Sequence, residues 1–219
     1  MDRIKTICSY LGKCESFADV GCDHGYCAEY MLKNNLCEKA VISDVSAKSL
    51  NKAETLLASY VKSGRCIPVC CDGLQAVGDV EQVLIAGMGG EEIVKILKEG
   101  YIPGKFVFQP MKNAPLLRNF LSDNGCKIIA DDIFKDGKFY FIIKGEKGKS
   151  VKDGEGAYGS AAQTEFGRDS LKNPLLKEYL AAEIAKNKGY LQNPMSEANR
   201  RVIEERIKFL TGVSEGEIE

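Results

Sequence analysis

Two kinds of segment are missing from this sequence: long apolar runs and a secretion signal. No run of eighteen apolar residues occurs, so no membrane-spanning helix is expected. The first residues, Met-Asp-Arg-Ile-Lys, have neither the apolar stretch nor the small-residue cleavage site of a secretory signal. We therefore expect a cytoplasmic protein without a membrane partner.

Metal ligands and paired cysteines are also scarce. The sequence has one histidine, His24, and no Cys-x-x-Cys pair, whereas zinc sites gather several such ligands. The nine cysteines are odd in number, and several lie among apolar residues, where a free thiol packs like a small hydrophobic group. The sequence therefore predicts neither a metal site nor a disulfide framework.

An excess of positive charge is absent too. The net charge is −1, whereas a basic balance is usual in proteins that bind nucleic acids. The balance holds on both sides of residue 148, with 19 basic and 19 acidic residues up to it and 11 and 12 after it. Composition alone thus counts against an RNA substrate, and any basic face has to arise from folding.

Enough apolar sequence is present for one substantial core and a small appendage, with 219 residues of which 44% are hydrophobic. Strand-like and helix-like segments alternate over the first half, which predicts an α/β fold with a parallel sheet. The expected parallel strands are 17–19, 40–43, 66–71, 83–86 and 105–109. Two further strand-like runs, 126–134 and 139–144, flank an Asp-Gly turn and predict an antiparallel hairpin at the end of the sheet.

A glycine loop follows the first strand and precedes a helix, which is the order of a nucleotide-binding unit. The dinucleotide fingerprint needs a second glycine two residues after Gly21, and Asp23 stands there instead. A carboxylate repels pyrophosphate, whereas Asp19 and Asp23 suit the ammonium and sulfonium groups of S-adenosylmethionine. The alternative is an ordinary tight turn, because glycine serves any position of positive φ.

Acidic residues also end the next two strands. Asp44 lies about twenty residues past the glycine loop, where a carboxylate can accept both ribose hydroxyls of an adenosine. Alternatively, Asp44 or Ser46 caps the helix expected over residues 47–62. Asp72 can accept the amino group of an adenine, although Asp-Gly is also a common turn dipeptide.

Glycines recur after the fourth strand, at Gly87, Gly89 and Gly90. Their backbone leaves an open surface at the ligand edge of the sheet, on which a flat base can lie. In methyltransferases of this architecture the end of the fourth strand faces the transferred methyl, and a resemblance to them implies that the target nucleophile is held here. Met88, between them, is either part of this surface or core filler. Gln109, at the end of the fifth strand, is a candidate hydrogen-bond partner for the substrate.

The composition changes near residue 148. Gly, Lys, Asp, Glu and Ser predominate over 145–159, which predicts a linker. Beyond it, apolar stripes predict two amphipathic helices in an antiparallel hairpin or short coiled coil. We expect a catalytic domain at 1–148, a linker at 149–170 and a helical hairpin at 171–219. Basic residues of the hairpin can meet phosphate, although a solvated charged face is the commoner explanation.

Several segments of this chain resemble the bacterial tRNA (adenine-22-N1)-methyltransferases. They are Asp19–Tyr26, Asp72–Leu74, Ile85–Gly90 and Gln109–Pro110. The resemblance spans residues 1 to about 145 and continues more weakly into the tail. It implies a Rossmann-like class I methyltransferase sheet with an antiparallel terminal hairpin, a coiled-coil-like helical extension, S-adenosylmethionine as methyl donor and tRNA as substrate. A monomer or weak dimer is expected.

The resemblance also implies roles for single residues. It implies that His24 and Met88 lie near the target base, where we also expect Gln109. It implies donor binding by Asp19, Gly21, Asp23, Asp44 and Asp72, and we further expect the donor site to include Gly25, Val45, Cys71, Gly73, Ala86 and Gly87. A tail that binds tRNA is expected to carry an excess of basic residues, whereas this tail is nearly balanced in charge.

The implied reaction needs little acid–base chemistry. Adenine N1 carries a lone pair and no proton, so His24 is better suited to stacking or hydrogen bonding than to accepting a proton, and positioning supplies most of the acceleration. N1 is paired in duplex RNA, so the base must be exposed or flipped. The alternatives are another methyl acceptor, a donor- or RNA-binding module without catalysis, and a dehydrogenase, which Asp23 disfavours.

Overall fold

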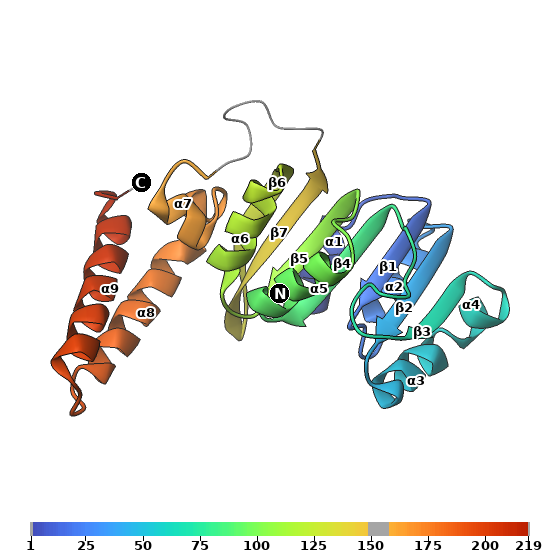
Figure 1. Ribbon diagram of the computed structural model, residues 1–219, viewed down its shortest axis with the longest axis horizontal. Coiled ribbons are helices and arrows are strands. Elements are labelled where there is room, and N and C mark those ends of the chain that lie inside the picture. The colour runs from blue at the N-terminus through green and yellow to red at the C-terminus, as the bar shows by residue number, and fades with distance from the viewer. Residues whose placement is uncertain (1, 149–157, 219) are drawn as a thin grey trace.

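The strands form one mixed sheet of seven, in the order β3-β2-β1-β4-β5-β7-β6, in a computed structural model that describes residues 2–148 and 158–218 (Figure 1). The first five strands are parallel, and β7 pairs antiparallel with both β5 and β6. This confirms the predicted Rossmann-like sheet with its terminal hairpin. The first part of the expected linker, 149–157, lies outside the described residues.

Apart from β3, which ends one residue before its expected end, the strands extend a little beyond the runs expected from the sequence. They are β1 Ser16–Val20, β2 Lys39–Asp44, β3 Cys66–Cys70, β4 Gln82–Met88, β5 Lys105–Pro110, β6 Cys126–Asp136 and β7 Lys138–Lys147. The central strand β4 is apolar over Val83–Ile85, and these side chains are fully buried, as expected for a parallel strand covered on both faces. Because β1 to β5 run parallel to one another, their carboxyl ends lie at one edge of the sheet.

The helices follow the expected order. They are α1 Arg3–Tyr10, α2 Tyr26–Lys33, α3 Ala47–Leu56, α4 Ala58–Lys62, α5 Gly90–Glu99, α6 Ala114–Asp123, α7 Ala161–Phe166, α8 Leu175–Tyr190 and α9 Glu197–Glu215. The single helix expected over 47–62 is wrong in one respect: it breaks at Leu57, whose backbone has φ −97° and ψ 14°. Leu57 is fully buried in the core that also contains Phe17 and Ile42 of the sheet. The helix breaks there because packing in this core outweighs the local preference for helix.

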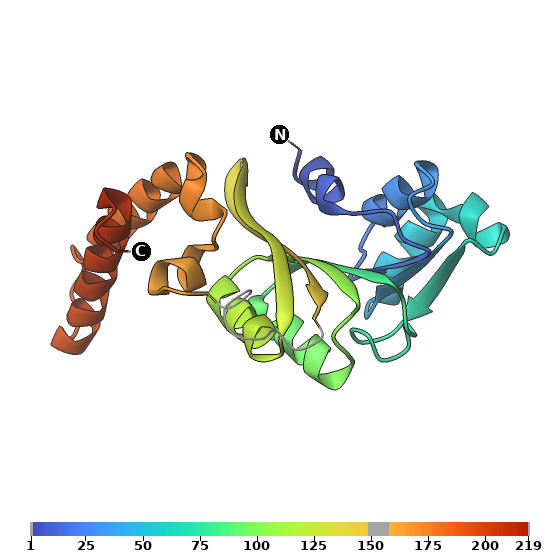
Figure 2. The same ribbon diagram turned by 90° about the horizontal axis from the view of Figure 1, so that it is seen from above.

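The helices cover the two faces of the sheet (Figures 1 and 2). On one face, apolar residues of α1, α2 and α3 pack with Phe17, Ile42 and Leu84. On the other face, α5 and α6 pack with Val20, Ile85 and other strand residues. The central strands are therefore covered on both faces, which leaves the strand ends as the open edge of the sheet there.

The C-terminal helices α8 and α9 lie side by side at one end of the molecule (Figure 1). Their core includes Leu176, Leu180 and Leu210 and continues onto Ile133 of the hairpin strand β6. The later part of the expected linker, 158–170, contains α7, whose Phe166 is buried in the same core. This part of the linker differs from an exposed loop because Ala162 and Phe166 form one apolar helix face.

A buried ion pair between α6 and β6 is hydrogen-bonded to this segment. Arg118 donates from Nε and Nη2 to the Asp131 carboxylate over 2.7 and 2.8 Å, and neither side chain is exposed to solvent. Arg118 Nη1 also donates to the Glu165 carbonyl at 2.6 Å, and the Tyr158 hydroxyl donates to Asp131 at 2.6 Å. The pair is thus fully hydrogen-bonded, as a buried charge requires.

Candidate functional site

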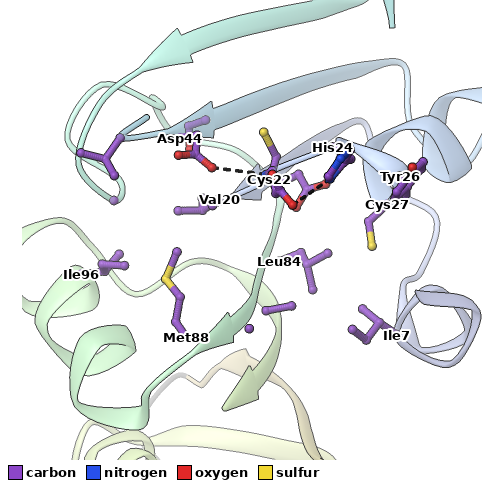
Figure 3. A pocket seen from close by; sticks show the side chains of 18 of the residues that line it. Ile7, Val20, Cys22, His24, Tyr26, Cys27, Asp44, Leu84, Met88 and Ile96 are labelled. Atoms are coloured by element: carbon purple, nitrogen blue, oxygen red, sulfur yellow. Dashed lines mark hydrogen bonds and ion pairs between the residues drawn. The ribbon is translucent and has the colours of Figure 1, made fainter. Parts of the chain in front are cut away.

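A cavity of about 470 Å³ opens at the carboxyl ends of β1, β2, β3 and β4 (Figure 3). Open α/β sheets bind ligands at this edge. Twelve of the residues singled out from the sequence line it: Asp19, Gly21, Asp23, His24, Asp44, Val45, Cys71, Asp72, Gly73, Ala86, Gly87 and Met88. Gly25 and Gln109 do not line it. Segments that are far apart in the sequence therefore meet around one hollow.

The glycine loop after β1 is held by its own backbone. Gly21 has φ +71°, and its N–H donates to the Ser43 carbonyl at 2.8 Å. A Cβ at Gly21 would lie 2.1 Å from the Met88 Cε atom, so only glycine allows Met88 to approach this turn. Met88 and the first loop thus form opposite walls of one narrow part of the cavity.

Gly25 has a packing role rather than a place on the cavity wall. It begins α2 with φ +74°. A Cβ there would lie 3.0 Å from the Ala53 Cβ and 3.1 Å from the Leu57 Cδ1. Gly25 therefore lets α2 pack closely on α3, and this close approach needed the tertiary structure to be seen.

Asp44 connects two loops at the cavity edge. Its Oδ2 accepts from the Asp23 backbone N–H at 3.3 Å (Figure 3). Its Oδ1 accepts from the Ser46 N–H at 2.8 Å. The cap of α3 is Ser46, whose hydroxyl accepts from the Ser49 N–H at 3.3 Å. Of the two capping candidates, Ser46 takes that role, and Asp44 faces the cavity with room for further donors.

Asp19 is a buried carboxyl at the base of the cavity. It is 6% exposed, and its Oδ2 accepts from the Ala28 backbone N–H at 3.2 Å. Burial, together with the charge of Asp44, raises the pKa of Asp19 to about 7 against the opposing effect of the Ala28 bond. A cationic ligand beside it would favour the ionised form and pull this pKa down.

Asp23 lies at the rim and already has cationic and imidazole partners. Lys52 Nζ lies 3.1 Å from its Oδ1, and His24 Nδ1 lies 2.7 Å from its Oδ2. The hydrogen bond from Lys52 is the largest cause that lowers the pKa of Asp23. The sequence analysis missed Lys52, which lies 29 residues away from Asp23. Asp23 therefore organises the rim rather than offering a free carboxylate.

His24 and Tyr26 form an aromatic pair at the same rim. Their rings are parallel within 3° with centroids 5.5 Å apart, and they lie together in Figure 3. The His24 side chain is 45% exposed, and Tyr26 is 49% exposed. Two exposed, stacked rings beside a polar cavity offer a flat surface for another planar group.

Ser43 is a site residue that the sequence did not indicate. It is 1% exposed and lines the cavity. Its hydroxyl is buried without a hydrogen-bond partner among residues 2–148 and 158–218. A buried polar group without a partner costs free energy, so Ser43 Oγ is poised for a ligand. A serine inside an apolar strand was its only sequence signal.

Arg3 is the second residue that was missed. It lines the cavity from α1, and its Nε and Nη2 donate to Gln109 Oε1 at 3.0 and 2.6 Å. Gln109 is fully buried, and its Nε2 donates to the Pro110 carbonyl at 3.0 Å. Gln109 thus stands behind Arg3 and holds the guanidinium. The guanidinium also lies 5.2 Å from the centre of the Tyr140 ring.

The other glycine positions divide between the cavity and packing. A Cβ at Gly87 would lie 3.0 Å from Arg3 Nη2, so Gly87 keeps the cavity floor open beneath Arg3. A Cβ at Gly90 would lie 2.2 Å from the Asn113 carbonyl oxygen, so Gly90 allows a close backbone contact.

Asp72 lies on the cavity wall beside a lysine. Lys95 Nζ lies 3.8 Å from Asp72 Oδ2, and both side chains are exposed.

Two kinds of feature are absent from the described part of the chain: a cluster of metal ligands and a membrane-spanning helix. Within it, no three His, Cys, Asp or Glu side chains gather into a group able to hold a metal ion. No helix among these residues combines the length and apolar character needed to cross a bilayer.

Comparisons with known proteins give the chain its relatives. A protein of Mycoplasma pneumoniae provisionally named a tRNA methyltransferase is 33% identical over 148 residues, which are 64% of this chain and 68% of that protein. The tRNA (adenine(22)-N(1))-methyltransferase of Bacillus subtilis is 28% identical over 153 residues, which are 67% of this chain and 64% of that enzyme. The chain thus spans about two thirds of the length of each relative.

A solved structure extends the similarity over nearly the whole chain. A Streptococcus pneumoniae protein, provisionally described as a tRNA (m1A22) methyltransferase and solved in complex with S-adenosyl-L-methionine, superposes with a TM-score of 0.83 at 25% identity. The match covers 97% of this chain and 98% of that one. These relatives confirm the resemblance drawn from the sequence segments.

The family described as a methyltransferase domain matches residues 1–143. This range includes the whole glycine loop, all five parallel strands and most of the terminal hairpin. The chain belongs to the methyltransferase domain family.

Proposed function

We propose that this protein transfers the methyl group of S-adenosylmethionine to N1 of an adenine in tRNA, at position 22. The observation that carries the proposal is the cavity at the ends of β1 to β4, where three of the four segments that resemble the tRNA methyltransferases converge. The names of the M. pneumoniae and B. subtilis relatives support the substrate class. The donor-bound S. pneumoniae structure supports the donor.

The residues of the cavity fit such a donor on three grounds. The Ser43 hydroxyl lacks a partner among the described residues, the turn at Gly21 has φ +71° and a Cβ there would meet the Met88 Cε atom, and buried Asp19 gains from a nearby cation. When bound, the donor supplies a methyl group carried on a cationic sulfur. We propose that Asp19 favours the positive groups, that Asp23, held by Lys52 and His24, orders the rim beside the donor, and that Asp44 and Asp72 accept from the ribose and the adenine.

The proposed acceptor asks the chain for positioning rather than for a base. Adenine N1 has a free lone pair, so no residue has to remove a proton before transfer, and alignment of the reacting atoms supplies most of the acceleration. We propose that the His24 and Tyr26 rings and Met88 hold the base. Gln109 acts through Arg3, because its amide is already used by the guanidinium and the Pro110 carbonyl.

The remaining proposals concern the whole molecule. We propose that residues 1–148 carry catalysis, that residues 149–170 link, and that residues 171–219 form an extension that contacts RNA. Lys188, Arg201 and Lys208 are exposed on α8 and α9 and offer cations for phosphate. We also propose that the protein is cytoplasmic and monomeric or weakly dimeric.

The test combines labelled donor with two unmodified tRNA transcripts that differ only at position 22. Transfer to the transcript with adenine, its loss on the transcript with guanine, and a mass that locates the methyl on N1 are the expected results. Transfer at another nucleotide would replace the proposed base. Donor binding without transfer to either transcript or to total tRNA would indicate a binding module.

A further inference from the structure

A second hollow of about 590 Å³ lies between α1 and α2. Its lining includes Ile4 and Lys5 from α1 and Tyr26, Tyr30 and Lys33 from α2. Ile4 and Tyr26 also line the cavity at the carboxyl ends of β1 to β4, which we call the donor cavity. The two hollows therefore share a wall. We refer to this second hollow as the α1–α2 groove. Whatever enters the donor cavity beside Tyr26 has the groove next to it.

The groove presents aromatic rings that the fold does not use for its core. Tyr26 is 49% exposed and Tyr30 is 37% exposed. They are four residues apart on α2 and therefore point from the same side of the helix. The Tyr26 ring is already parallel to that of His24. A planar group placed along this row would meet successive rings.

Cations border the same rings. Lys5 and Lys33 are exposed on the two helices that form the groove. Neither has an ion-pair partner in the described part of the chain. Two carboxylates also line the groove. Asp2 accepts from the Ile4 N–H as the cap of α1, and Glu29 lies in the first turn of α2, where the helix dipole favours an acid.

We propose that the α1–α2 groove binds the nucleotide next to the methylated adenine, with its base on Tyr30 and its phosphate between Lys5 and Lys33. This inference rests on the proposed function. It assigns an RNA contact to a local surface with two lysines that are unpaired within the described residues, although the net charge of the chain is −1. A base moved out of its stack into the donor cavity leaves its neighbour within reach of the adjoining groove. Aromatic stacking beside cations is the usual way in which proteins hold unpaired RNA.

The test compares Tyr30→Ala and Lys33→Ala with matched variants outside the groove. The controls are Leu116→Ala, which removes a 43% exposed side chain from α6 on the other face of the sheet, and Lys127→Ala, which removes an exposed cation from β6. Tyr30 and Lys33 do not line the donor cavity. Calorimetric donor affinity therefore checks that each variant is folded and competent.

The expected result is a loss of RNA affinity confined to the groove variants. Tyr30→Ala raises the dissociation constant and the KM for tRNA by about 5- to 20-fold, at the lower end of measured base–aromatic stacking. Lys33→Ala lowers the slope of log affinity against log salt concentration by about one unit, as loss of one phosphate contact does. The two controls leave both quantities at their wild-type values.

The outcomes separate this inference from the proposed function. Wild-type tRNA affinity and slope retained in both groove variants would overturn the groove, whether or not methyl is transferred. The same loss in Leu116→Ala or Lys127→Ala would also overturn it, because the effect would not be local. Failure of the wild-type protein to methylate any tRNA would overturn the proposed function, while the binding measurements would still decide the groove.

Discussion

The Asp19 carboxyl makes opposite contributions to stability and to donor binding, and Asp19→Asn separates them. Burial raises the pKa of Asp19 from 3.8 to about 7. Each unit of pKa difference corresponds to about 1.4 kcal/mol, so ionising Asp19 in the folded protein costs about 4 kcal/mol more than in the unfolded chain. Asparagine removes the ionisation and keeps an oxygen that can accept from the Ala28 N–H.

The sign follows from the two protonation states. Because the pKa is raised on folding, the contribution of Asp19 to stability is fully present below about pH 4. It is lost as the pH rises from there through about 7. Between pH 5 and pH 8 the wild-type protein should therefore lose about 2–3 kcal/mol of unfolding free energy that the Asp19→Asn variant keeps. Urea denaturation without donor, at several pH values, measures this difference.

Donor binding should show the reverse dependence. A cationic donor favours the ionised carboxylate, whose population rises through pH 7. If only that form binds, the wild-type donor affinity improves about eightfold between pH 6 and pH 7.5. Asp19→Asn should bind more weakly and without this rise. Calorimetry on both proteins gives the two profiles, and parallel profiles in stability and in donor affinity would refute the assigned role of Asp19.

Three further changes test other parts of the structure. Gly21→Ala places a Cβ at φ +71° against Met88, so we expect a loss of about 1–2 kcal/mol of stability and weaker donor binding; adding Met88→Ala should restore part of it, and a neutral single variant in thermal melting and calorimetry would contradict the geometry. Asp131→Asn leaves Arg118 buried without its ion pair and should lower the unfolding free energy by about 3–5 kcal/mol; a loss below about 1 kcal/mol in urea denaturation would argue against it. His24→Ala should slow methyl transfer to tRNA and leave calorimetric donor affinity intact; unchanged transfer would remove His24 from the substrate site.

Much of the fold and part of the site were accessible from local sequence. Strand and helix periods depend on which residues are apolar within a few positions, and an apolar strand such as Val83–Ile85 carries that signal plainly. Because parallel strands end at one edge, acids at strand ends, such as Asp19, Asp44 and Asp72, could be expected around one ligand. The hairpin turn at Gly137, with φ +66°, follows the same local logic.

Only the tertiary structure decided which groups pair. Arg3 reaches Gln109 across 106 residues of sequence, and this contact turns an expected substrate ligand into a support. The ion pair between Lys52 and Asp23 depends on how separate loops pack at the sheet edge. The same packing buries the Ser43 hydroxyl away from every hydrogen-bonding group of the described residues. Side-chain hydrogen bonds form between neighbours in space. Local periodicity predicts the elements, and their packing determines those neighbours.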